Sequence, residues 1–267
     1  MSDIVTVLAV TTATGVATGL GAVPVFFRMR VSHRTYDAAL GLAAGIMFAA
    51  SVFALIIPGM DEGGLRPVMV GVFLGGFGLL FANRLIPHVH EWYNERVGHG
   101  GLDPDTLDAV LAATGEDRLS KLRRAVLVGG AITLHNAPEG LAMGVAFASG
   151  LESVASVLAV VIALQNVPDG FAFAIPMSDT GMTNRRVLLW TTLSGTVPQV
   201  VMGVFGFYVV ELATGVFPVA AGFAAGAMMA VVFREMIPTS HSHGYADAAT
   251  GAFLVGFALL VVVDAVL

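Results

Sequence analysis

Long apolar stretches separated by short polar or glycine-rich joints form the main pattern of this chain. A helix needs about 20 mostly apolar residues to cross a bilayer. By this measure the sequence predicts eight membrane spans, at residues 4–27, 36–58, 68–87, 125–148, 153–177, 187–210, 215–237 and 247–266. Most joints are short, and the one long joint covers residues 88–124. We therefore expect a single transmembrane domain over residues 1–267.

The composition agrees with a membrane protein and excludes several other classes. Apolar residues make up 56% of the chain and charged residues 12%, whereas soluble domains carry roughly 25% charge. This balance fits neither a soluble globular protein nor a disordered one. Cysteine is absent, which excludes disulfides and thiolate metal sites. The net charge is −6 without a large basic cluster, so we expect no nucleic-acid partner. The predicted fold class is all-α integral membrane.

The positive charges predict the orientation of the chain. If the N-terminus faces outside, all but Arg66 of the 13 Lys and Arg residues fall in inner joints or near inner helix ends. Loops on the cytoplasmic side carry such an excess of Lys and Arg. Both termini are therefore expected outside, and residues 88–124 are expected to form a cytoplasmic loop. The predicted location is the cell (cytoplasmic) membrane, as a multi-pass protein.

Two pairs of related segments indicate an inverted repeat. Residues 43–47 and 224–228 resemble each other, and each is followed by an Ile-Pro step, at residues 57–58 and 237–238. Residues 135–140 and 165–170 share the pattern x-Asn-x-Pro-acid-Gly on two antiparallel spans. The expected relation pairs spans 1–3 with spans 6–8, and leaves spans 4 and 5 in the middle. Transporters with inverted repeats bind substrate near the midplane on broken helices, which is the arrangement we expect here.

The paired central motif carries candidate metal ligands. His135 and Glu139 are four residues apart, as are Gln165 and Asp169, so each pair shares one helical face. Both pairs fall about 15–18 Å into their spans at a rise of 1.5 Å per residue, close to the bilayer centre. Two adjacent buried carboxylates cannot both ionise without a cation, which can be a metal ion or protons. Nitrogen and oxygen donors without sulfur suit divalent transition metals, with Zn²⁺ as the leading ion.

The prolines and asparagines of the same motif add further oxygen atoms. Pro138 and Pro168 cannot donate a backbone hydrogen bond, so one carbonyl in the preceding turn of each span needs another partner. Such a carbonyl must line a cavity or find a partner inside the membrane. Asn136 and Asn166 are positioned to satisfy these carbonyls or to act as metal ligands.

These motifs resemble those of the ZIP (Zrt-, Irt-like) family of divalent metal transporters, in its GufA-like prokaryotic branch. The resemblance rests on the two central motifs together with residues 85–90 and 235–241. It implies eight helices in a 3+2+3 arrangement, both ends outside, transport into the cytoplasm and a homodimer.

Carried over to this chain, the resemblance implies a transport site and a second position beside it. The transport site consists of His135, Glu139, Gln165 and Asp169. The neighbouring second metal position would use Asn136, Glu139, Asn166 and Asp169. That second position usually gains a glutamate from helix 6. Residues 194–199 contain none, and Gln199 is the nearest polar substitute.

Histidines and one glutamate near the inner helix ends form a secondary set. His88 and His90 lie at the inner end of the third span, and Glu235, His241 and His243 lie at that of the seventh. Histidine is a common metal ligand. This set is compatible with an exit or sensing site for the same metal, and equally with solvated helix ends.

The sequence therefore predicts a transporter, not an enzyme, which moves Zn²⁺ or also Cd²⁺, Fe²⁺ or Mn²⁺ by alternating access. The metal is cargo and no cofactor is expected; the other partner is the lipid bilayer. The sequence is also compatible with three alternatives. An intramembrane metal-dependent hydrolase would use a metal-bound water, a proton-coupled solute transporter would use the acids as a relay, and a metal-gated sensor would pass no ions.

Overall fold

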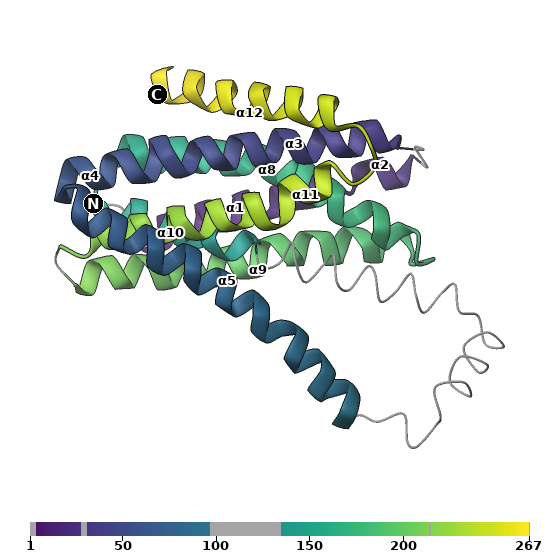
Figure 1. The fold of residues 1–267 in the computed structure, drawn as a ribbon, viewed down its shortest axis with the longest axis horizontal. Helices are drawn as coiled ribbons and strands as arrows, with labels where there is room; N and C mark the ends of the chain where they lie inside the picture. Colours follow the sequence, from purple (N-terminus) through teal and green to yellow (C-terminus); the bar gives the residue numbers. More distant parts are fainter. Residues whose placement is uncertain (1–3, 28–30, 97–134, 214, 267) are drawn as a thin grey trace.

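The computed structural model describes residues 4–27, 31–96, 135–213 and 215–266, and for residues 83–96 it describes the backbone alone. Throughout these ranges the chain forms a bundle of long helices and contains no strand (Figure 1). A further helix, without a label in Figure 1, covers residues 135–149. The others are α1 (Ile4–Leu20), α2 (Val23–Phe26), α3 (His33–Ala49), η1 (Ala50–Ile56), α4 (Ile57–Gly63), α5 (Leu65–Arg96), α8 (Glu152–Ser178), α9 (Asn184–Leu212), α10 (Phe217–Val231), η2 (Val232–Met236), α11 (Ile237–Ser240) and α12 (Ala246–Val266).

Seven helical stretches in the described residues are long and apolar enough to cross a membrane. They correspond to seven of the eight expected spans: α1 with α2, α3 through α4, α5, α8, α9, α10 through α11, and α12. The expected fourth span, residues 125–148, is described only from residue 135, from where it is helical to residue 149. The chain is therefore a helical protein of the integral membrane class.

The ends of the described chain lie at the same end of the bundle. Figure 1 shows the start of α1 and the end of α12 on the left, beside α4, whereas α2 and α11 lie at the opposite end. The joints are tight, since the break between α4 and α5 is the single residue Gly64, with φ of 80°. Glycine adopts this left-handed conformation without the steric cost that a Cβ atom brings.

Two local expectations about the helices are wrong. The helix that contains the expected third span, residues 68–87, continues to Arg96 and so enters the expected loop 88–124; the rest of that loop lies outside the described residues. The expected break in the fifth span is also absent, because α8 is one continuous helix through Pro168 and Pro176. A proline removes one helical hydrogen bond, and membrane helices tolerate this where neighbouring helices satisfy the freed groups.

The irregular helical geometry lies instead in two π-helical segments that the sequence did not predict. Segment η1 joins α3 to α4, and η2 joins α10 to α11. In both cases a proline, Pro58 or Pro238, is the second residue after the π-helical segment. Short π-helical segments inside α-helices occur frequently at functional sites. Segment η2 carries Glu235.

Glycines bring the helix backbones into direct contact in two matching pairs. Helix α3 packs on α12, and α10 packs on α5. A Cβ atom at Gly45 of α3 would lie 2.0 Å from the backbone oxygen of Phe253 on α12. A Cβ atom at Gly75 of α5 would lie 1.9 Å from the backbone oxygen of Phe223 on α10. Small residues allow such close approach, which strengthens van der Waals packing in a membrane.

A second group of helices packs in the same manner around α1. This helix contacts both α9 and α8. A Cβ atom at Gly15 of α1 would lie 2.4 Å from the Cα atom of Thr196 on α9. A Cβ atom at Gly140, on helix 135–149, would lie 2.3 Å from the backbone oxygen of Gln199 on α9. Helices α1, 135–149, α8 and α9 thus form one closely packed group, and they carry both copies of the central motif.

The contact between α5 and α10 leads to a first prediction. The substitution Gly75→Ala should destabilise the protein by about 1–3 kcal/mol, because the added methyl group overpacks a backbone contact that no side-chain movement can relieve. Gly78 on the same helix has nothing within 4 Å of its Cβ position, so Gly78→Ala is the matched control and should leave stability unchanged or slightly higher. Thermal unfolding in detergent measures both, and equal melting temperatures would contradict the packing described.

Candidate metal centre

The six residues of the paired motif lie in the interior, on two different helices. His135, Asn136 and Glu139 come from helix 135–149, and Gln165, Asn166 and Asp169 come from the middle of α8. His135 is 6% exposed, Asp169 is 3% exposed and the other four are fully buried. Buried polar groups are stable only where partners or a bound ion compensate the loss of water. Each group therefore needs a partner, and these partners define the site.

Glu139 is the centre of a hydrogen-bond network of amides. Its Oε1 atom accepts from Nε2 of Gln165 at 2.5 Å, and its Oε2 atom accepts from Nε2 of Gln199 at 2.6 Å. Gln199 lies on α9 and is fully buried. The sequence suggested Gln199 only as a substitute ligand, and the structure places it in direct contact with the central acid. Three helices thus meet at the Glu139 carboxylate.

The two asparagines of the motif have different partners. Asn136 Oδ1 accepts a second hydrogen bond from Gln199 Nε2 at 3.0 Å. Asn166 Nδ2 donates to the backbone oxygen of Thr14 on α1 at 2.7 Å. The carbonyl that Asn166 satisfies is therefore on a neighbouring helix and is not the one released by Pro168. Through this hydrogen bond to Asn166, helix α1 also helps to position the residues of the site.

Three buried oxygen atoms on one stretch of α8 have no hydrogen-bond partner among the described residues. They are Gln165 Oε1, Asn166 Oδ1 and Asp169 Oδ2. An unsatisfied buried acceptor costs about 1–3 kcal/mol, and more for a charged group. Native structures rarely leave such groups unpaired without a reason such as a bound ion or water. Three together, beside a buried carboxylate, form a set of oxygen donors suited to a cation.

Electrostatics ties the two helices together. The Asp169 carboxylate interacts with both Glu139 and His135 across the interface. Two carboxylates in a buried space repel each other unless a positive charge lies between them or a proton neutralises one. A divalent cation would compensate both charges at once. Among the described residues, however, no three His, Asp or Glu side chains come together closely enough to hold a metal by themselves. A metal held between these helices would therefore also need amide oxygens as ligands.

His135 makes a contact that the sequence did not predict. Its Nε2 atom lies 2.5 Å from Oε2 of Glu235 on η2. We expected Glu235 to belong to the secondary set at an inner helix end, with His241 and His243. The structure instead places Glu235 next to the central site, because η2 directs this side chain toward helix 135–149. The contact joins the helix group around α1 to the group that contains α10.

Two other members of the secondary set, His243 and His241, have partners other than Glu235. His243 Nδ1 lies 2.7 Å from Oδ1 of the fully buried Asp37 at the start of α3, and its ring stacks on that of His33. His241 Nδ1 lies 2.9 Å from the Ile237 backbone oxygen. The side chains of His88 and His90 lie outside the described residues. An exit or sensing site built from this set remains a prediction.

Thr14 is a part of the site that sequence reasoning missed. Its hydroxyl lies 3.1 Å from Gln199 Oε1 and its backbone oxygen accepts from Asn166. One signal was available in the sequence. Thr11, Thr14 and Thr18 recur every three to four residues on the first span and are all buried. Such a polar stripe on an apolar helix marks the face that meets other polar groups.

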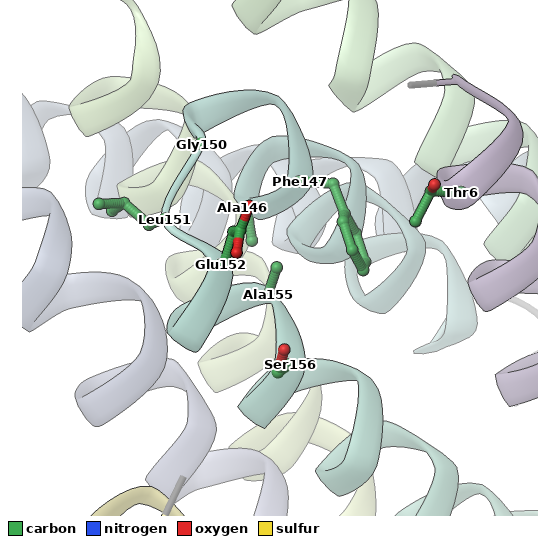
Figure 2. Close-up of a pocket in the computed structure, with 8 residues that line it drawn as sticks. All are labelled: Thr6, Ala146, Phe147, Gly150, Leu151, Glu152, Ala155 and Ser156. Carbon is green, nitrogen blue, oxygen red and sulfur yellow. The ribbon is translucent and has the colours of Figure 1, made fainter. Parts of the chain in front are cut away.

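A pocket of about 280 Å³ lies away from these residues, at the turn between helix 135–149 and α8. Figure 2 shows its lining, which includes Thr6 in the first turns of α1, Phe147, Glu152 and Ser156. Its wall is shared between polar and apolar atoms, and none of the six motif residues reaches it. The pocket is therefore separate from the candidate metal centre.

The fold and the site define a class: a polytopic helical membrane protein with a buried set of nitrogen and oxygen donors. Comparisons with known proteins then identify the family. A family model described as ZIP zinc transporter matches residues 108–264. The chain is 34% identical over 260 residues to zinc transporter GufA of Myxococcus xanthus, covering 94% of each protein. It is 36% identical over 267 residues to zinc transporter ZIPB of Bordetella bronchiseptica, covering 94% of this chain and 78% of the relative.

A eukaryotic relative gives the same result. The human zinc transporter ZIP11 is 31% identical over 319 residues, with 92% of this chain and 93% of the relative covered. The chain therefore belongs to the ZIP family of transporters. The predicted resemblance, including its prokaryotic GufA-like branch, is confirmed.

Proposed function

We propose that this protein moves a divalent transition metal ion, Zn²⁺ first of all, across the cell membrane into the cytoplasm by alternating access. The ion would be bound by His135, Glu139, Gln165 and Asp169, with Asn136 and Asn166 beside them. The observation that carries the proposal is the group of three unpartnered buried oxygens on α8 next to the Glu139 carboxylate. A cation in this space would satisfy the oxygens and neutralise the two acids together.

The donor set supports the choice of metal. It combines one imidazole, two carboxylates and amide oxygens, and the chain has no cysteine. Zn²⁺ accepts histidine and carboxylate ligands, whereas Cu⁺ prefers sulfur. The three relatives described above are all named zinc transporters. Cd²⁺, Fe²⁺ and Mn²⁺ are further candidates as cargo, because a single histidine gives the site only modest selectivity.

We further propose eight spans in a 3+2+3 inverted repeat with both termini outside. The matching position of η1 and η2 supports it, as does the matching glycine packing of α3 on α12 and α10 on α5. The common end of α1 and α12 in Figure 1 is consistent with an even number of spans. The distribution of Lys and Arg supports the orientation. Membership in the family further suggests a homodimer.

The family resemblance suggests that spans 1, 4, 5 and 6 move against the other spans, elevator-like, and the packing supports this division. Helices α1, 135–149, α8 and α9 would move as one group against α3, α5, α10 and α12, since the closest backbone contacts fall within each group. The contact between His135 and Glu235 crosses between the groups. Because His135 Nε2 cannot bind a metal while it holds Glu235, ion binding would release this connection. Binding and helix movement would thus be coupled at one side chain.

The alternatives have less support. A metal-dependent hydrolase needs protein ligands, an open coordination position and a general base, and the described part of the chain gathers no three ionisable ligands. A proton-coupled solute transporter would use the acids alone and would leave the amide oxygens of α8 without a role. A sensor without flux is distinguished by measuring transport.

Uptake into proteoliposomes tests the function and should depend on pH. Protons compete with the metal for Glu139 and Asp169, so occupancy should be high near neutral pH and should fall as pH decreases through the range in which carboxylates titrate. We expect saturable Zn²⁺ uptake at neutral pH that falls at least about tenfold in acid, since each carboxylate that takes up a proton no longer attracts the ion. Protein-free liposomes are the control. Uptake of no metal at any pH by folded protein would contradict the proposal.

A further inference from the structure

Gln199 is held on three sides within the candidate metal centre. Its single Nε2 atom donates to Glu139 Oε2 at 2.6 Å and to Asn136 Oδ1 at 3.0 Å. Its Oε1 atom accepts from the Thr14 hydroxyl at 3.1 Å. The side chain is fully buried. All the hydrogen-bonding atoms of this amide therefore have partners, and both of its N–H bonds are directed at oxygen acceptors.

The orientation of this amide follows from its neighbours. An ionised carboxylate accepts hydrogen bonds and cannot donate one. If the Gln199 amide were turned over, its oxygen would face Glu139 Oε2 and Asn136 Oδ1, and three acceptors would meet in a buried space. The Thr14 hydroxyl fits either orientation, because the Val10 and Thr11 backbone oxygens are also within reach, at 3.0 and 3.2 Å. The nitrogen atom of Gln199 must therefore face the acid.

The position of the Gln199 nitrogen is the position that a cation shared by Asn136 and Glu139 would occupy. Metal ions and N–H groups seek the same lone pairs on oxygen, so the two compete for this space. The two N–H bonds of the Gln199 amide place partial positive charges at this position, and the side chain remains neutral. A second ion at this position would have to displace a buried, fully bonded group.

The oxygens on the other side of Glu139 are in the opposite situation. Gln165 Oε1, Asn166 Oδ1 and Asp169 Oδ2 lie on α8 and have no partner among the described residues. A carboxylate has about four lone-pair positions, so Glu139 retains the capacity to bind an ion toward α8 while it accepts the two amide hydrogens. The α8 side of Glu139 therefore offers three oxygens that have no partner, although Gln165 Nε2 also donates to Glu139 there, whereas on the α9 side Gln199 already occupies both Glu139 Oε2 and Asn136 Oδ1.

We propose that Gln199 limits the buried centre to one metal ion, because its amide group permanently fills the cation position between Asn136 and Glu139. This inference rests on the proposed function, since it concerns how many ions the same site holds. It makes Gln199 the residue that determines the stoichiometry of the site. A carboxylate at position 199 could not donate to Glu139 and would need a cation between the two acids.

The experiment counts ions bound per chain in purified, detergent-solubilised full-length protein. Zn²⁺ is titrated against a chromophoric chelator, and the bound metal is confirmed by elemental analysis. We expect one ion for the wild-type protein and two for Gln199→Glu. Gln199→Met has a similar volume but no donor and no charge, and should bind one ion. Thermal unfolding of each variant checks that it is folded.

Loading with Co²⁺ gives an independent signature that a purely structural role of Gln199 would not change. Two Co²⁺ ions that share one carboxylate lie about 3.5–4 Å apart, as in other two-metal sites, and are magnetically coupled. We expect a coupled pair by electron paramagnetic resonance in Gln199→Glu and an isolated ion in the wild type.

Each outcome of these measurements decides a specific point. Two ions in the wild-type centre, or one ion in a folded Gln199→Glu variant, would overturn the inference while leaving transport intact. Loss of all binding in Gln199→Met would also overturn it, because Gln199 would then be needed to form the site. Absence of any bound metal in the folded wild-type protein would remove the proposed function itself, and the inference with it.

Discussion

The substitution Glu139→Gln should abolish metal uptake by the reconstituted protein. Glu139 is fully buried, and its two carboxylate oxygens connect Gln165 on α8 with Gln199 on α9. An amide of the same size keeps the volume but removes the negative charge that compensates the ion. Removing one partner of a buried ion pair costs about 3–5 kcal/mol, and each 1.4 kcal/mol corresponds to a factor of ten. We expect uptake to fall about 100-fold or more.

Glu211→Gln is the matched control for this variant. Glu211 lies at the exposed end of α9, and the substitution makes the same change of charge without touching the centre. Its uptake should equal that of the wild type. Initial rates of Zn²⁺ entry, measured with a fluorescent indicator inside proteoliposomes, compare the two variants at matched protein content. Wild-type rates in a folded Glu139→Gln protein would mean that the ion crosses by another route.

The substitution Gly170→Val should prevent stable folding. Gly170 follows Asp169 in the second copy of the motif, and a Cβ atom there would lie 1.7 Å from the backbone oxygen of Thr18 on α1. Overpacking typically costs about 1–3 kcal/mol, and occasionally more. Here the obstacle is backbone, so α1 and α8 must separate. This movement would also break the hydrogen bond from Asn166 to Thr14, and we expect a loss above about 3 kcal/mol on the same scale.

Gly251→Val provides the control, because nothing lies within 4 Å of the Cβ position of Gly251 on the exposed face of α12. Both variants introduce a valine side chain into a membrane helix, Gly170→Val into α8 and Gly251→Val into α12. Size-exclusion chromatography and thermal unfolding in detergent should report a monodisperse, stable Gly251→Val protein and an aggregated or strongly destabilised Gly170→Val protein. Similar melting temperatures would show that α1 and α8 do not pack as closely as described.

The membrane spans could be predicted from the sequence because each is encoded locally. An apolar stretch of sufficient length becomes a helix in a bilayer whatever its neighbours are, since every backbone group must be hydrogen-bonded within it. The expected span 153–177 and the observed α8 at Glu152–Ser178 therefore agree almost to the residue. The limits of the third span were less accurate, because polarity ends a span but does not end the helix, which continues to Arg96.

The central motif could also be found in the sequence, since a buried acid in an apolar span is costly and needs a purpose. Glu139 and Asp169 were identified on this basis, and the structure places both in the interior. What the sequence could not predict was how the residues of the site are paired. The partners come from other helices: Gln199 of α9 donates to Glu139, the Thr14 backbone oxygen of α1 accepts from Asn166, and Glu235 of η2 contacts His135. A pairing between distant segments depends on the approach and rotation of whole helices.

The local geometry of the helices was predicted less well for the same reason. Pro168 suggested a broken helix, yet α8 continues through it. The irregular turns occur instead at η1 and η2, each of which ends two residues before a proline, Pro58 or Pro238, in spans where no break was expected. Sequence by itself determined the membrane class, the number of apolar stretches and the acids on which the site is built, because these follow from local hydrophobicity and the cost of buried charge. Only the tertiary structure decided which amide groups donate hydrogen bonds to the acids and which oxygens are left without a partner. Both outcomes depend on the close packing of helix backbones that glycines permit.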